Sequence, residues 1–201
     1  GEALEQARKI NAIVLDKTGT LTKGKPAVTR VVTMNGIDER ALLRLVAAAE
    51  TSSEHPLGEA VVAYAHQLGL DLPAVTHFGS VTGKGVQAVV EGYEVVAGNA
   101  ALMKQYGVNI QALADEAGAV AQAGATPVYA TLNGELAGLI AIADILKPES
   151  IEAVAQLKAL GLAVWMLTGD NRLTAEAIAR QVGIDQVLAE VLPEQKAAQI
   201  Q

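Results

Sequence analysis

The chain has 201 residues, of which 51% are hydrophobic, and this apolar content excludes an intrinsically disordered protein. It carries 15 basic and 22 acidic residues, a net charge of −7, which argues against a broad nucleic-acid-binding face. The lack of cysteine excludes a disulfide scaffold, a thiolate zinc site and a cysteine nucleophile. No apolar run approaches the roughly 20 residues that span a bilayer, and no signal peptide opens the sequence, so we expect this chain to be soluble.

The first predicted element is a buried parallel strand, because residues 10–15 form a mostly apolar run of strand length. This strand ends at Asp16, and in open α/β sheets ligands bind beyond the carboxyl ends of strands. Two helices follow. Asp38 caps the first, which runs to about Glu50, while the second begins at Pro56 and stops at Gly69.

Two hairpins and an alternation of strands and helices complete the pattern. The hairpins join residues 86–90 to 93–96 and residues 127–132 to 135–143 through the turns Glu91-Gly92 and Asn133-Gly134, with a helix over 109–123 between them. The last part alternates a helix over 148–161, a strand over 162–167, a helix over 174–182 and a strand over 186–189. We therefore predict an α/β fold, in which an antiparallel α+β domain, residues 27–143, is inserted into a parallel-sheet domain made of residues 1–26 and 144–201.

The most informative motif is Asp16-Lys17-Thr18-Gly19-Thr20-Leu21-Thr22. A carboxylate at a strand end, beside a lysine and hydroxyl residues, suits a nucleophile for phosphoryl transfer. The motif resembles the phosphorylation signature of P-type ATPases. The resemblance implies that Asp16 accepts the γ-phosphate of ATP, that Lys17 balances phosphate charge, and that Asp16 and the backbone carbonyl of Thr18 bind Mg²⁺.

Two further motifs are similar to P-type ATPase motifs in the same order along the chain. Thr168-Gly169-Asp170 follows the second apolar strand, and the resemblance implies that Thr168 and Gly169 hold the phosphate while Asp170 positions nucleotide and Mg²⁺. The segment Pro193-Glu194-Gln195-Lys196 is similar to the family's Pro-Glu-Asp-Lys, with Lys196 as a second phosphate-balancing lysine.

The stretch Glu50-Thr51-Ser52-Ser53-Glu54-His55-Pro56 resembles the Ser-Glu-His-Pro motif of heavy-metal-transporting P-type ATPases. By this resemblance His55 packs on adenine and Glu50 meets the amino edge of the base. A lone His-Pro before a helix is otherwise a capping or surface histidine. Glycine-rich pieces of the same family's nucleotide site resemble residues that open and close the first hairpin: Gly83, Gly85, Gly98 and Asn99.

The family implies a haloacid-dehalogenase-like phosphorylation domain with an inserted nucleotide-binding domain, served by ATP and Mg²⁺. One alternative is a soluble haloacid-dehalogenase-type phosphohydrolase with a cap domain, but its general acid, an aspartate two residues after the nucleophile, is replaced by Thr18. Another is a nucleotide-binding module without catalysis. Asp144-Ile145-Leu146-Lys147-Pro148 resembles the family's hinge, which an interdomain linker would also explain.

The resemblance also implies what lies outside this sequence. We expect further Mg²⁺ ligands beyond Gln201, and actuator and membrane domains in the same parent protein, at the cytoplasmic face of a membrane. The transported ion, Cu⁺ by family resemblance, would bind in the membrane domain. ATP and ADP are the expected small-molecule partners, nucleic acid is not expected, and phosphate transfer requires the two domains to close around one ATP.

Overall fold

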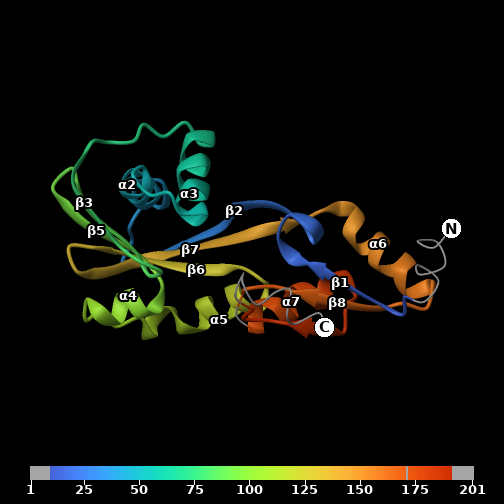
Figure 1. Ribbon diagram of the computed structural model, residues 1–201. Helices are drawn as coiled ribbons and strands as arrows, with labels where there is room; N and C mark the ends of the chain where they lie inside the picture. Colours follow the sequence, from blue (N-terminus) through green and yellow to red (C-terminus); the bar gives the residue numbers. More distant parts are fainter. Residues whose placement is uncertain (1–9, 171, 192–201) are drawn as a thin grey trace. The chain divides into compact units, whose positions relative to one another are not determined.

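The computed structural model describes residues 10–170 and 172–191 (Figure 1). The chain divides into two compact units, one within residues 1–24, 122–124 and 144–201 and the other within residues 25–121 and 125–143. The domain limits expected from the sequence, after residues 26 and 143, stay a prediction. Within the described ranges, no helix has the length and apolar character needed to cross a membrane.

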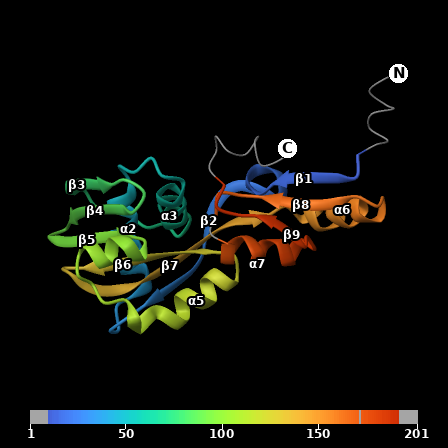
Figure 2. The same cartoon turned by 60° about the horizontal axis from the view of Figure 1, so that its bottom comes forward.

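The first unit contains a parallel sheet of three strands in the order β1-β8-β9 (Figure 2). These are β1 (Ala12–Asp16), β8 (Ala163–Leu167) and β9 (Gln186–Leu188), connected through helices α6 (Pro148–Ala159) and α7 (Arg172–Val182). The core of the unit joins the sheet to both helices and includes Val154, Val164, Met166 and Ile178. The alternation of strands and helices predicted for this part is confirmed.

The second unit is built on an antiparallel sheet with the strand order β2-β7-β6-β5-β4-β3. Its strands are β2 (Thr22–Thr33), β3 (Val75–Val81), β4 (Gly85–Val90), β5 (Tyr93–Gly98), β6 (Thr126–Leu132) and β7 (Glu135–Leu146). Its helices are α2 (Glu39–Glu50), α3 (Pro56–Gln67), α4 (Ala100–Gln105) and α5 (Ala114–Gln122). Strands β2 and β7 continue into the first unit at one end.

Apolar side chains lie on both faces of this sheet, so that the second unit has two cores. Helices α2 and α3 cover one face, and α4 and α5 cover the other (Figure 1). Alternation along β7 shows the division directly, because Ile140 and Ile142 belong to the first core whereas Leu139 and Ala141 belong to the second. The sheet is thus the middle layer of three, which fixes the loops at its ends in place.

Local sequence signals placed most elements correctly. Asp38 caps α2 by accepting a hydrogen bond from the Ala41 N–H, and the turn residues Asn133 and Gly134 both have positive φ, as a two-residue hairpin requires. The helix predicted over 109–123 begins only at Ala114, after a short turn over Gln111–Leu113.

Three elements, β2, β3 and α4, carry no clear local signal in the sequence and are not predicted from it. Strand β2 contains Gly24 and Pro26, and β3 contains Gly79, residues that usually interrupt a strand pattern. Helix α4 has only six residues, too few for a helical period to show. Pairing with neighbouring strands and packing on the sheet decide these elements.

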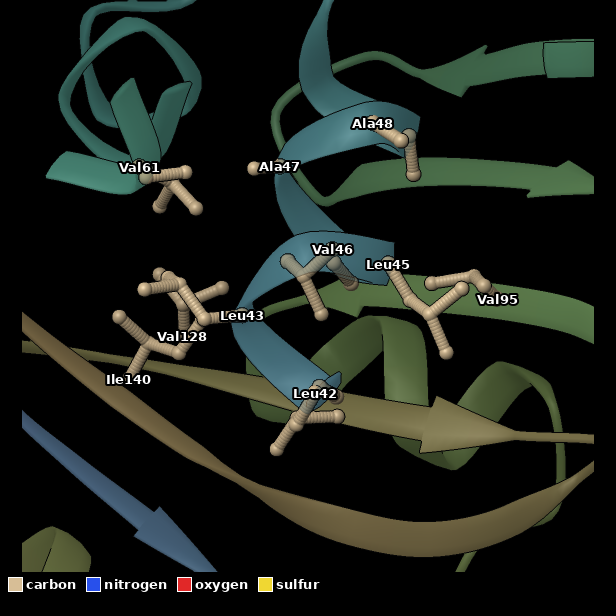
Figure 3. Close-up of a cluster of buried hydrophobic side chains, with 14 of the residues drawn as sticks. Leu42, Leu43, Leu45, Val46, Ala47, Ala48, Val61, Val95, Val128 and Ile140 are labelled. Atoms are coloured by element: carbon tan, nitrogen blue, oxygen red, sulfur yellow. The ribbon is translucent and has the colours of Figure 1, made fainter. Parts of the chain in front are cut away.

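Leu43 provides a test of the first core. It is fully buried, and Figure 3 shows it on α2, beside Val128 of β6 and Ile140 of β7. We expect Leu43→Ala to lower the free energy of unfolding by about 2–5 kcal/mol, because the lost contacts leave a cavity. Leu160→Ala, at a side chain 77% exposed, is the matched control and should change stability by less than about 0.5 kcal/mol. Equal losses in chemical denaturation would contradict this assignment.

Candidate functional site

Asp16 is the last residue of β1, and the register of the parallel sheet brings a second motif beside it. Asp16 is paired with Leu167 of β8, so the chain leaves both strands at the same edge of the sheet. Thr168, Gly169 and Asp170 follow Leu167 directly. The structure therefore brings together the two motifs that the sequence places far apart.

An ion pair joins the two motifs. Lys17 Nζ lies 2.6 Å from Asp170 Oδ2, and the Lys17 side chain is only 10% exposed. Thr168 is buried, and its hydroxyl accepts a hydrogen bond of 3.1 Å from the backbone N–H of Asp170. A buried cation held beside a carboxylate can balance the charge of an incoming phosphate.

Packing leaves room for a Cβ atom at Gly169. A Cβ atom there would make only an ordinary contact, 3.4 Å from the Val191 carbonyl oxygen. Protein packing therefore does not require glycine at this position. A close approach of phosphate to the Gly169 backbone, which the resemblance to P-type ATPase motifs implies, stays a prediction.

The loop after Asp16 is tied to the segment that begins with Asp144. The Asp144 carboxylate accepts hydrogen bonds from the Thr22 hydroxyl and, at 3.0 Å, from the Gly24 N–H. Lys147 Nζ donates to the Gly19 carbonyl oxygen at 2.7 Å. Asp144 and Lys147, expected to act at the hinge, thus hold the loop after Asp16 in shape within the first unit.

The donor atoms around Asp16 suit Mg²⁺. Asp16 and Asp170 supply hard carboxylate oxygens, and the Thr18 carbonyl follows Asp16 by two residues. Within residues 10–170 and 172–191, no group of three or more His, Cys, Asp or Glu side chains forms a metal cluster. Proteins usually hold Mg²⁺ through one or two carboxylates together with substrate phosphates. Lys196, predicted to balance phosphate charge, lies outside the described residues.

A separate cavity of about 460 Å³ lies in the second unit. It is partly open to solvent and combines polar and apolar groups, as small-molecule sites do. All six residues predicted to bind nucleotide line it: Glu50, His55, Gly83, Gly85, Gly98 and Asn99. Other lining residues include Ser53, Gly58, Phe78, Lys84, Thr126 and Val128.

Glu50 is the buried carboxylate of this cavity. It ends α2 and is only 7% exposed. Burial raises the pKa of its carboxyl above the ordinary value, and a hydrogen bond from the Ser53 hydroxyl opposes this shift in part. A poorly solvated acceptor at a cavity wall is suited to receive a hydrogen bond from an amino group of a ligand.

His55 combines two roles in one side chain. Its Nδ1 caps α3 by accepting a hydrogen bond of 3.2 Å from the Leu57 N–H, and its ring lines the cavity. The capping interpretation is therefore correct, and it does not compete with the binding interpretation. Since Nδ1 is an acceptor, the proton of the neutral ring is on Nε2.

Gly85 and Gly98 are required by their own packing. They face one another across β4 and β5. A Cβ on either would lie well inside 3.0 Å of a backbone oxygen, that of Ala97 or of Lys84 respectively. The resemblance implies that these glycines let a ligand approach the backbone. In the structure they let β4 and β5 approach each other, and this close approach shapes the cavity wall.

Asn99 also has a structural role at this wall. Its side-chain oxygen accepts a hydrogen bond from the Leu102 N–H at 3.0 Å, and its Nδ2 donates to the Gly83 carbonyl at 3.0 Å. Both ends of the side-chain amide are therefore engaged in holding the turn around Gly83 against α4. A direct contact between Asn99 and nucleotide stays a prediction.

Phe78 and Gly58 are lining residues that the sequence analysis did not find. Phe78 is the one phenylalanine of the chain, is 40% exposed, and lies in β3, a strand that was not predicted. The signal for Phe78 is its exposure outside the buried cores, and this exposure is visible only in the structure. In the sequence, Gly58 is only one residue of the helix predicted to begin at Pro56.

Comparison with known proteins identifies the family of this chain. The family model described as haloacid dehalogenase-like hydrolase matches residues 10–201. The chain is 48% identical over 200 residues to the copper-exporting P-type ATPase of Bacillus subtilis (strain 168), and 47% identical over 199 residues to a silver exporting P-type ATPase of Salmonella typhimurium. These matches cover 100% and 99% of the chain but 25% and 24% of the relatives, so the chain spans about a quarter of their length.

Solved structures agree with the sequence relatives. The crystal structure of a zinc-transporting PIB-type ATPase in the E2.Pi state matches 98% of the chain and 32% of its own, with a TM-score of 0.82 and 36% identity. A catalytic CPx-ATPase domain matches 99% of the chain and 68% of its own, with a TM-score of 0.67 and 25% identity. The chain therefore belongs to the haloacid dehalogenase-like hydrolase family and is similar, along its whole length, to a part of the heavy-metal-transporting P-type ATPases.

Proposed function

We propose that this chain is the ATP-binding and phosphate-accepting part of a P-type ATPase that exports heavy-metal ions. The observation that carries the proposal is the meeting of Asp16, Lys17 and Asp170 at one edge of the parallel sheet. The cavity around Glu50 and His55 supplies a second, independent site of the size and chemistry that a nucleotide base needs.

The proposed reaction transfers the γ-phosphoryl group of ATP to Asp16. A carboxylate oxygen of Asp16 forms a bond to the γ-phosphorus, the bond from that phosphorus to the bridging oxygen breaks, and ADP leaves. Lys17 balances the charge on the phosphoryl oxygens, while the backbone at Gly169 approaches them closely. Mg²⁺, when bound by Asp16, Asp170 and the Thr18 carbonyl, supplies further charge neutralisation.

Thr18 distinguishes this proposal from a soluble phosphohydrolase. A phosphohydrolase of this family uses an aspartate two residues after the nucleophile as a general acid, by the resemblance described above, and threonine cannot supply that proton at neutral pH. The aspartyl phosphate should therefore persist, as a transport cycle requires. The identity to copper- and silver-exporting relatives supports this choice.

The cargo and the location follow from the same relatives. Cu⁺ is the cargo we propose, since copper export is named for the relative at 48% identity. Membrane and actuator domains of the parent protein are the proposed partners, and the chain would lie at the cytoplasmic face. ATP binding needs none of these partners, so it can be measured on the chain alone.

Replacement of the nucleophile tests the reaction. We expect Asp16→Asn in the parent transporter to abolish the acid-stable, hydroxylamine-sensitive label from γ-labelled ATP, because an amide cannot form an acyl phosphate. ATP binding should persist. The matched control is Asp185→Asn, at an exposed partner of Lys158, which should keep the label. Label retained in Asp16→Asn would place the nucleophile elsewhere.

His55 can be changed so that the helix cap stays while the ring is lost. Asparagine is a favourable cap, so His55→Asn should melt like the wild type yet bind ATP roughly tenfold more weakly, the order of a lost stacking contact. His55→Ala removes the cap as well and should cost about 1 kcal/mol of stability. Calorimetric titration and thermal melting measure the two effects. Wild-type affinity in His55→Asn would make His55 a cap alone.

Glu50 should lower the stability of the chain at neutral pH. The pKa of the Glu50 carboxyl is raised in the folded state, so its protonated form stabilises the fold at low pH. This stabilisation is fully present below the unfolded-state pKa and is lost as the pH rises through the folded-state pKa. We expect Glu50→Gln to be more stable than the wild type above that pH, to lose this advantage in acid, and to bind ATP more weakly. Denaturation at several pH values, with Glu94→Gln at an exposed position as control, measures this difference. An advantage independent of pH would contradict the assignment.

A further inference from the structure

Gly58 lies where the buried Glu50 meets helix α3. It is the third residue of α3, in the first turn after the His55 cap. Its backbone conformation is helical and requires no glycine. Glycine also weakens a helix relative to alanine, so a different constraint must act at this position.

The constraint is contact with the Glu50 carboxylate. A Cβ atom on Gly58 would lie well inside 3.0 Å of Glu50 Oε2 and 3.0 Å from the Ser53 hydroxyl oxygen. The carboxylate oxygen thus occupies the space in which a side chain on Gly58 would begin. The first turn of a helix also exposes N–H groups and the positive end of the helix dipole, which favour a carboxylate there.

The same three residues line the cavity, which connects this contact to the ligand. Glu50, Ser53 and Gly58 all belong to its wall. The carboxylate is buried and cannot move away from α3 into bulk solvent without leaving the wall. Its position relative to a bound base is therefore set by how closely it approaches α3.

We propose that Gly58 is a positioning residue that fixes the Glu50 carboxylate and so gives the cavity its preference for an adenine amino group. This inference rests on the proposed ATP site, including the contact of Glu50 with the base, and adds the residue that positions the carboxylate. ATP offers an amino group at C6 of the base, whereas ITP offers a carbonyl oxygen there. A Glu50 carboxylate held against α3 can accept a hydrogen bond from the C6 amino group of ATP. The C6 carbonyl oxygen of ITP cannot donate this hydrogen bond and repels the carboxylate.

The test compares ATP and ITP binding to the 201-residue chain by calorimetric titration. We expect the wild type to prefer ATP by about 10- to 100-fold, the effect of one hydrogen bond to a charged group. Gly58→Ala should remove most of this preference by weakening ATP binding, with little change for ITP. Gly118→Ala is the matched control, since Gly118 lies within α5 with no atom near its Cβ position. It should keep the preference and melt at the same or a higher temperature.

A second background shows whether Gly58 acts through Glu50. In Glu50→Ala the obstructing carboxylate is gone, so adding Gly58→Ala should not change nucleotide binding further. This pair stays informative if Gly58→Ala alone does not fold. An unchanged ATP preference in a folded Gly58→Ala, or an equal loss in both backgrounds, would overturn the proposal.

The two proposals fail in different ways. A wild-type chain that binds neither nucleotide contradicts the ATP site itself, and the inference falls with it. A wild-type chain that binds ATP and ITP equally overturns the inference alone and leaves ATP binding in place.

Discussion

The parallel pairing of β1 with β8 is the constraint on which the proposed phosphate-accepting site depends. It places Asp16 opposite Leu167, so that the two following loops start at one edge of the sheet and Lys17 reaches Asp170. A shift of one residue in this register would turn the side chains of β1 to the opposite faces. Contacts of Asp144 and Lys147 with the loop after Asp16 add to this constraint, since they bind Gly19 and Thr22 of the motif and Gly24 just after it.

The cavity of the second unit depends on a different constraint, the close approach of backbone where side chains are missing. Gly85 and Gly98 let two strands approach at one wall, and Gly58 admits the Glu50 carboxylate at another. The buried carboxylate opposes stability at neutral pH, since burial disfavours its charged form. A group that costs stability while it lines a cavity is typical of a binding site. His55 differs, because the same ring stabilises α3 and faces the cavity.

Together these features relate the two units to one function. In the proposed function, the first unit would supply the nucleophile Asp16, the charge-balancing Lys17 and carboxylates for Mg²⁺, whereas the cavity that suits a base lies in the second unit. Each unit is packed independently. The parallel sheet of the first unit has one core, and the antiparallel sheet of the second unit has two. Under the proposed function, a substitution at Glu50 or His55 would change ATP binding without touching Asp16, because Glu50 and His55 line a cavity in the other unit.

The sequence alone determined the features that depend on neighbours along the chain. Local chemistry accounts for the strand before Asp16, the caps at Asp38 and His55, the Asn133-Gly134 turn and the order of the motifs. Tertiary structure alone decided the strands that contain Gly24, Pro26 and Gly79, the place of Phe78 in the cavity wall, and the reason for glycine at 58, 85 and 98. The physical reason is that these depend on atoms distant in sequence. Asp144 and Thr22 are 122 residues apart, and no local pattern shows which of two such groups will share a hydrogen bond.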